Sequence, residues 1–121
     1  MGPPALALVV VAIHPGLAGR GPSPGERWAL PPGGRLRVGL RRTDTIRVSM
    51  AGGVLLGGHT AYVFERAADG RVFLVHTGHI GSARVAGSEG RGRSEVAAGD
   101  LVELLTVTGE LGVGLRLVAD A

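Results

Sequence analysis

Apolar and polar residues alternate over short segments of this chain, and the alternation predicts β-strands rather than helices. In Gly57–Arg66 two aromatic residues alternate with smaller or polar ones, Asp69-Gly70 forms a turn pair, and Arg71–His76 is again rich in β-forming residues. Two such segments joined by a turn pair predict a β-hairpin.

Further short strands are expected on both sides of this hairpin. They lie at Ala5–Ile13, Glu26–Leu30, Arg35–Leu40, Asp44–Ser49, Ala83–Ala86, Leu101–Val107 and Val113–Val118. The Gly-, Arg- and Ser-rich segment Gly87–Ser94 is expected to be a mobile loop. No stretch combines a helical period with caps at both ends. The pattern predicts an all-β sandwich or barrel of about ten or eleven short strands, in antiparallel or mixed sheets.

Length and composition fit this prediction. The 121 residues suit a single domain, 1–121, with residues 1–5 and 119–121 as loose ends. The chain has 22 Gly and 7 Pro but only one Trp, one Tyr and two Phe, so we expect many turns and a core of aliphatic side chains. The absence of cysteine excludes disulfides and thiolate metal sites, and it suits a cytoplasmic location.

The apolar run Ala5–Ile13 raises the question of a membrane segment or a signal peptide. It is far shorter than the ~20 apolar residues that a membrane helix needs. It also lacks a basic region before it, which a signal peptide would have. A buried first strand is therefore expected, and no membrane partner.

The distribution of charge along the chain does not favour nucleic-acid binding. All 13 basic residues are arginine and the formal net charge is +3. A nucleic-acid-binding protein is expected to show a basic run with interleaved aromatic residues. Here the arginines are scattered and the aromatic residues few, so no nucleic-acid partner is expected.

The residues that could carry catalysis or bind a metal form no known motif. His59, His76 and His79 could supply a zinc site, but on strands and loops their spacing does not by itself bring the rings together. Without lysine there is no Walker A motif, and no serine stands in a nucleophile elbow. We therefore expect no metal, no cofactor and no enzymatic activity.

Several short pieces occur in a characteristic order along the chain. They are Trp28–Leu30 with Pro31–Gly34 and Leu36–Gly39, then Asp44–Val48, His59–Thr60, Asp69–Leu74 and Ala98–Val102. This order resembles the forkhead-associated (FHA) domain, a β-sandwich whose loops at one end bind phosphothreonine peptides. The resemblance covers about Leu8 to Val118 and implies an FHA-like sandwich with a non-catalytic role.

The residues that bind phosphate in the resembled family match poorly. There, an arginine follows the strand-ending glycine, but Leu40 follows Gly39 here and Arg41 stands one place late. The serine that donates to the phosphate corresponds to Leu56, and the next arginine to Gly57. Losing two or three charge-assisted donors, each contributing about 1.5 to 3 kcal/mol, weakens binding by several powers of ten.

Two functional predictions follow from the resemblance. In the first, the chain is a non-catalytic protein–protein interaction or scaffold module whose usual phosphothreonine site is degenerate. In the second, it is a phosphothreonine-peptide adaptor that uses Arg41, Arg42, Ser82 and Arg84 in place of the usual donors. The alternative that these arginines only solvate exposed loops stays open.

The expected site and partners can be stated by residue. The candidate partner-binding residues are Arg41, Arg42, Gly57, Gly81, Ser82 and Arg84, and the resemblance implies that Gly39, Gly58 and His59 support the loops. The expected partner is another protein, which is threonine-phosphorylated in the adaptor alternative. The proline-free segment Val113–Val118, interpreted as an edge strand, adds the prediction of a homo-oligomer formed through strand edges.

Overall fold

The computed structural model describes residues 3–19, 21–39, 44–47, 60–76, 82–90, 92–106 and 108–120. These residues form eleven strands and one short 3-10 helix, η1 (Pro15–Leu17). The strands are β1 (Leu6–Ile13), β2 (Arg27–Ala29), β3 (Arg35–Gly39), β4 (Ile46–Arg47), β5 (Thr60–Arg66), β6 (Val72–His76), β7 (Ser82–Val85), β8 (Ser88–Glu89), β9 (Arg93–Val96), β10 (Leu101–Leu105) and β11 (Leu111–Ala119).

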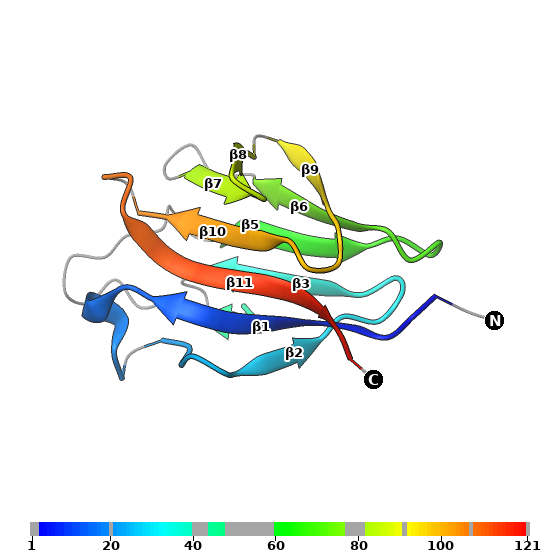
Figure 1. Cartoon of the computed structure of the whole chain (residues 1–121), viewed down its shortest axis with the longest axis horizontal. Coiled ribbons are helices and arrows are strands. Elements are labelled where there is room, and N and C mark those ends of the chain that lie inside the picture. Colours follow the sequence, from blue (N-terminus) through cyan, green and yellow to red (C-terminus); the bar gives the residue numbers. More distant parts are fainter. Residues whose placement is uncertain are drawn as a thin grey trace.

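The strands form two sheets that pack face to face (Figure 1). The six-stranded sheet is antiparallel and has the order β2-β1-β11-β10-β7-β8. The five-stranded sheet has the order β4-β3-β5-β6-β9 and is mixed, because β3 and β4 run parallel. The expectation of a sandwich with ten or eleven strands in antiparallel or mixed sheets is confirmed.

Alternate side chains of each strand fill the space between the sheets. Leu6, Leu8 and Val10 of β1 enter the core from one side, and Tyr62 and Phe64 of β5 enter it from the other. This is the period of two that a half-buried strand imposes on its side chains. The few aromatic residues leave most of the core to leucine and valine.

The β5–β6 hairpin has the predicted place and turn. Tyr62 pairs with His76, and Arg66 with Val72. In the turn, the backbone N–H of Gly70 donates to the Ala67 carbonyl at 3.0 Å. Gly70 adopts a φ of 96°, in the left-handed region that favours glycine.

Two sequence expectations were wrong because local sequence does not identify a strand's neighbours. Gly87–Ser94 contains β8 and the first residues of β9, and β9 pairs along β6. This pairing gives strand geometry to a polar segment of low intrinsic β-propensity. Val113–Val118 is not an edge strand, because β11 lies between β1 and β10.

Among the described strands, β2, β8, β4 and β9 lie at the sheet edges. Each has two to four described residues, and each carries an arginine or a glutamate. Short, charged edges disfavour the addition of a further strand.

The ends of the described chain are tied to the sandwich. The backbone N–H of Asp120 donates to the Ala5 carbonyl at 2.8 Å, and the Asp120 carboxylate pairs with Arg27 at 2.9 Å. The Pro4 carbonyl accepts a hydrogen bond from Arg66 at 2.6 Å. Within the described residues, no helix has the length and apolarity needed to cross a membrane.

Candidate functional site

The strand ends near η1 define one end of the sandwich, here called the loop end (Figure 1). β1, β3, β6 and β10 finish there, and β5, β7 and β11 begin there. The resemblance places the candidate site in loops at this end. Of the predicted residues, Arg41, Arg42, Gly57, Gly58, His59 and Gly81 lie outside the described residues, whereas Gly39, Ser82 and Arg84 lie within them.

Gly39 is the buried last residue of β3. It pairs with Thr60 after a register shift and lies beside Arg47 of the parallel strand β4. The structure therefore places it where β3, β4 and β5 meet at the loop end. The support of the loops that the resemblance implied for Gly39 stays a prediction.

Ser82 begins β7, and Tyr62 holds it in place. The Tyr62 hydroxyl donates to the Ser82 carbonyl at 2.9 Å, and the Tyr62 ring stacks on His76 with centroids 4.7 Å apart. Burial raises the pKa of Tyr62 to about 12, so the hydroxyl keeps its proton and remains a donor at neutral pH. Tyr62 thus fixes the end of β6 relative to the start of β7.

Arg84 lies two residues beyond Ser82 on the outer face of the six-stranded sheet, because Ala83 between them is buried in the core. In register, Arg84 faces Glu103 of β10 and Glu89 of β8. The structure thus brings Ser82 and Arg84 to one face, and two carboxylates flank the arginine. Their negative charge opposes recruitment of a phosphate by Arg84.

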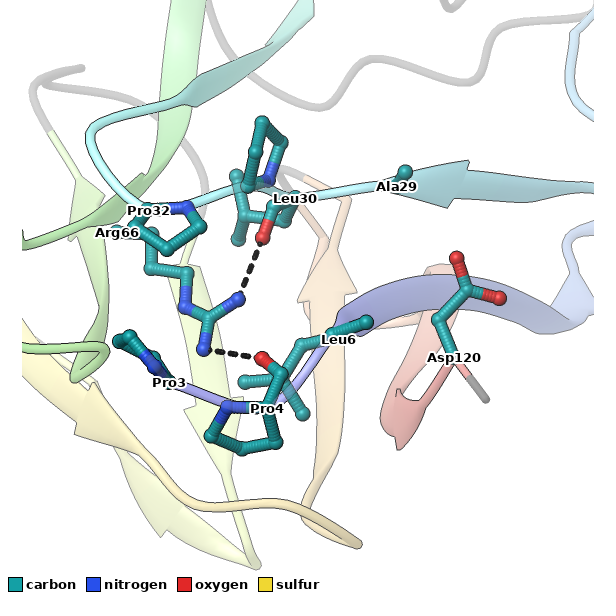
Figure 2. Close-up of a pocket in the computed structure, with 10 residues that line it drawn as sticks. Pro3, Pro4, Leu6, Ala29, Leu30, Pro32, Arg66 and Asp120 are labelled. Carbon is teal, nitrogen blue, oxygen red and sulfur yellow. Dashed lines mark hydrogen bonds between the residues drawn. The ribbon is translucent and has the colours of Figure 1, made fainter. Parts of the chain in front are cut away.

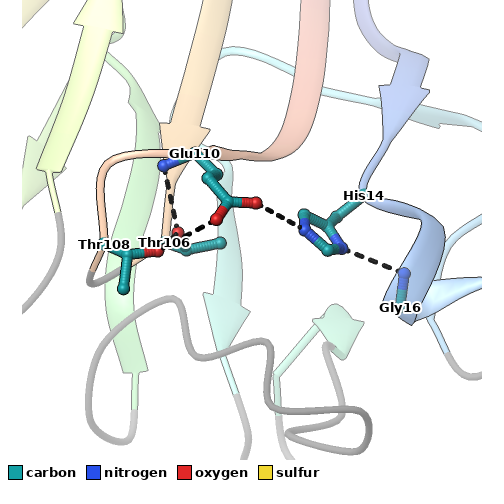
Figure 3. A network of polar contacts seen from close by, with 5 residues as sticks. All are labelled: His14, Gly16, Thr106, Thr108 and Glu110. Carbon is teal, nitrogen blue, oxygen red and sulfur yellow. Dashed lines mark hydrogen bonds and ion pairs between the residues drawn. The ribbon is translucent and has the colours of Figure 1, made fainter.

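A polar network at the loop end was missed by sequence reasoning (Figure 3). His14 Nε2 lies 3.0 Å from the Glu110 carboxylate, while its Nδ1 accepts the Gly16 backbone N–H at 2.9 Å. Since Nδ1 is an acceptor, Nε2 carries the proton and donates to Glu110. The Thr106 hydroxyl accepts the Glu110 backbone N–H at 3.1 Å. This network joins the end of β1 to the β10–β11 hairpin.

A pocket of about 240 Å³ lies at the opposite end of the sandwich (Figure 2). Pro3, Pro4, Pro31 and Pro32 line it, together with the buried Arg66. Each guanidinium nitrogen of Arg66 donates to a main-chain carbonyl: Nε to Gly70, Nη1 to Leu30 and Nη2 to Pro4. These bonds join three segments, so we assign Arg66 a structural role. The sequence contains a signal for its inward direction, since Tyr62, Phe64 and Arg66 are spaced two residues apart and therefore lie on the same face of β5.

The outer face of the five-stranded sheet carries two ion pairs. The Arg71 guanidinium holds the Glu95 carboxylate through two contacts, at 2.8 and 3.2 Å. The hydrogen bond to Glu95 raises the pKa of Arg71, and the same bond lowers the pKa of Glu95. Arg35 lies 3.6 Å from Glu65. Within the described part of the chain, no three histidine or acidic side chains gather as a metal-binding group.

Comparison with known proteins identifies the fold. No protein-family profile and no curated protein sequence matches the chain. Among solved structures, it is similar to the FHA domain of the CT664 protein from Chlamydia trachomatis, with a TM-score of 0.66 and 18% identity over 97% of this chain and 99% of that chain.

Two further structures agree. An FHA domain of an Arabidopsis thaliana hypothetical protein gives a TM-score of 0.71 and 20% identity over 100% of this chain and 92% of that chain. The FhaA FHA domain, crystallised in complex with the intracellular domain of Rv3910, gives a TM-score of 0.59 and 14% identity over 93% of this chain and 98% of that chain. The fold is therefore FHA-like over nearly the whole chain, as the order of sequence pieces predicted.

Proposed function

We propose that this chain is a non-catalytic protein–protein interaction module in which the usual phosphothreonine site is degenerate. The observation that carries the proposal is the FHA-like fold over nearly the whole chain, since FHA domains are non-catalytic interaction modules. One domain of this fold is found bound to another protein, namely FhaA with the intracellular domain of Rv3910.

Degeneracy of the site is supported by residue chemistry. Leu56 and Gly57 stand at positions where the resembled family has a serine and an arginine, and neither can donate a side-chain hydrogen bond. The described arginine among the candidates replaces these donors poorly, because Arg84 is flanked by Glu89 and Glu103.

The experiment is a titration of the protein with a phosphothreonine peptide library and with the matched unphosphorylated library. Binding that does not depend on the phosphate supports the proposal. Phosphate-dependent binding in the micromolar range or tighter, weakened by Ser82→Ala and Arg84→Ala, would establish the adaptor alternative instead. If the protein binds peptides of neither library, both phosphate-independent and phosphate-dependent binding are refuted for peptides of this kind.

A further inference from the structure

The two outer faces of the sandwich differ in charge. On the six-stranded sheet, Arg27 pairs with Asp120, Arg84 faces two glutamates in register, and Arg116 donates to the Gly99 carbonyl. The five-stranded sheet exposes five arginines against two glutamates. The five arginines are Arg35, Arg37, Arg47, Arg71 and Arg93. This second face is therefore positively charged.

Two of these arginines stand at the ends of one cross-strand row. Arg37 of β3 pairs with Val63 of β5, Val63 with Val75 of β6, and Val75 with Arg93 of β9. We call these four residues the arginine–valine row. Their inward neighbours, among them Leu36, belong to the core, so the row lies on the outer face.

No carboxylate neutralises this row. All ten acidic residues of the chain lie in the described ranges, and none of them forms an ion pair with Arg37 or Arg93. The neighbouring row differs, because there Arg35 and Glu65 pair across the strands. The arginine–valine row is thus a strip with an arginine that has no carboxylate partner at each end and partly exposed valines between them.

We propose that the arginine–valine row binds an extended acidic segment of a partner protein. This inference rests on the proposed interaction function and names the chemistry of the partner. Guanidinium groups match carboxylate geometry, and Arg71 already holds Glu95 through two contacts on this face. Opposite charge at both ends and an apolar middle define the complementary ligand.

Strand spacing sets the spacing of the ligand's charges. Arg37 and Arg93 are three strand intervals apart, which is about 14 Å at ~4.8 Å per interval. An extended peptide crossing the strands covers this distance in about four residues at ~3.4 Å each. An even spacing puts both carboxylates on the same side of the peptide. The ligand is an acidic residue, an apolar residue two places later, and a second acidic residue two places after that.

The same face offers little to nucleic acid. Single strands are bound by stacking bases on exposed aromatic rings. Phe73 is the aromatic residue of the described outer face, and it is only 9% exposed. The Arg93 guanidinium lies 3.8 Å from its ring centroid and that of Arg71 lies 5.1 Å away. Because two guanidinium groups lie against the Phe73 ring, it offers no free face on which a base could stack. An acidic peptide is therefore favoured over nucleic acid as the ligand of this face.

The test is fluorescence anisotropy with a labelled peptide of the sequence Gly-Glu-Ser-Leu-Ser-Glu-Gly. One control peptide carries Gln for both Glu residues. A second control has one extra serine between the leucine and the following glutamate, which turns the second carboxylate to the other side. We expect the first peptide to bind and each control to bind about tenfold more weakly or not at all.

The matching protein variants separate this face from net charge. The double variant Arg37→Gln with Arg93→Gln should lose about tenfold or more in affinity for the peptide, and wild-type binding should weaken with salt. Arg27→Gln with Arg116→Gln removes the same charge from the other sheet and should stay within about twofold. The single variant Arg37→Gln, checked for folding by circular dichroism, serves if the double variant does not fold.

Three results would overturn the proposal. The first is no binding of the peptide, the second is equal losses in the two double variants, and the third is tighter binding of a labelled single-stranded oligonucleotide to the same face. None of these results determines whether the protein binds peptides in the library titration. Failure of the arginine–valine row as a binding site is therefore distinguishable from failure of the proposed interaction function.

Discussion

Replacement of the buried arginine Arg66 gives a sharp test of how the two ends of the chain are held. Its side chain is 2% exposed and donates to the carbonyls of Pro4, Leu30 and Gly70. In Arg66→Met the apolar stem is retained while all three donors are lost. The N-terminal segment, the residues after β2 and the β5–β6 turn then lose their common partner.

The size of the effect follows from the burial of each acceptor. The bond to the Leu30 carbonyl is buried, and an acceptor left unpaired there costs about 1 to 3 kcal/mol. The bonds to Gly70 and Pro4 are only partly buried, so water can replace the donor and each loss is about 0.5 to 1 kcal/mol. Removing a buried charge offsets part of this loss. We expect a net destabilisation of about 2 to 4 kcal/mol.

Urea unfolding followed by circular dichroism measures this change. The matched control is Arg35→Met on the same sheet, whose exposed guanidinium lies 3.6 Å from Glu65 and whose loss should change stability by less than about 0.5 kcal/mol. Arg66→Lys keeps the charge but cannot reach three separate carbonyls, and it should lose at least about 1 kcal/mol. If Arg66→Met unfolds within about 0.5 kcal/mol of wild type, the structural role assigned to Arg66 is wrong.

Three further predictions concern other parts of the structure. Burial raises the pKa of Tyr62 to about 12 from an ordinary value of 10.0, so the fold favours the protonated phenol. The contribution of Tyr62 to the free energy of unfolding is complete below pH ~10 and declines as the pH rises to ~12, by roughly 2 to 3 kcal/mol in all. Urea unfolding at several pH values across this range measures the decline. Tyr62 is the chain's one tyrosine, so phenolate absorbance reports it alone, and a midpoint near 10 in the folded protein would contradict the assignment. Gly70→Ala should destabilise the protein by about 1 kcal/mol more than Gly99→Ala: both glycines have a positive φ, but only at Gly70 would the new Cβ approach Pro3, at 2.7 Å. Equal effects in thermal unfolding would show that Pro3 does not lie against this turn. Because the edge strands are short and charged, light scattering after size exclusion should give a monomer, and a stable dimer at micromolar concentration would contradict this prediction.

Local pattern was sufficient for the central hairpin and insufficient for the sheet edges. Gly57–Arg66 and Arg71–His76 alternate clearly around a turn pair, so β5 and β6 were predictable. β9 was not, because its polar residues become a strand only through pairing with β6. The position of β11 in the middle of its sheet likewise depends on β1 and β10, which are distant in sequence from each other.

The candidate site was predictable only in part, for similar reasons. Gly39 ends β3, as the sequence pieces predicted, whereas Ser82, expected in the loop before Ala83, is the first residue of β7. The two glutamates beside Arg84 come from other strands. The predicted residues Arg41, Arg42 and His59 lie outside the described residues, so their roles stay predictions. The arginine–valine row depends on the neighbourhood of four strands, and no local pattern indicates it.

The most direct test of a phosphate-independent interaction module is a ratio of two dissociation constants. For each peptide that the protein retains from the libraries, the constant is measured with threonine and with phosphothreonine at the same position. The proposed function puts Leu56 and Gly57, which have no side-chain donor, in place of the usual phosphate donors, so we expect the two constants to agree within about threefold. A phosphopeptide that binds about a hundredfold more tightly than its unphosphorylated form would contradict the proposed function.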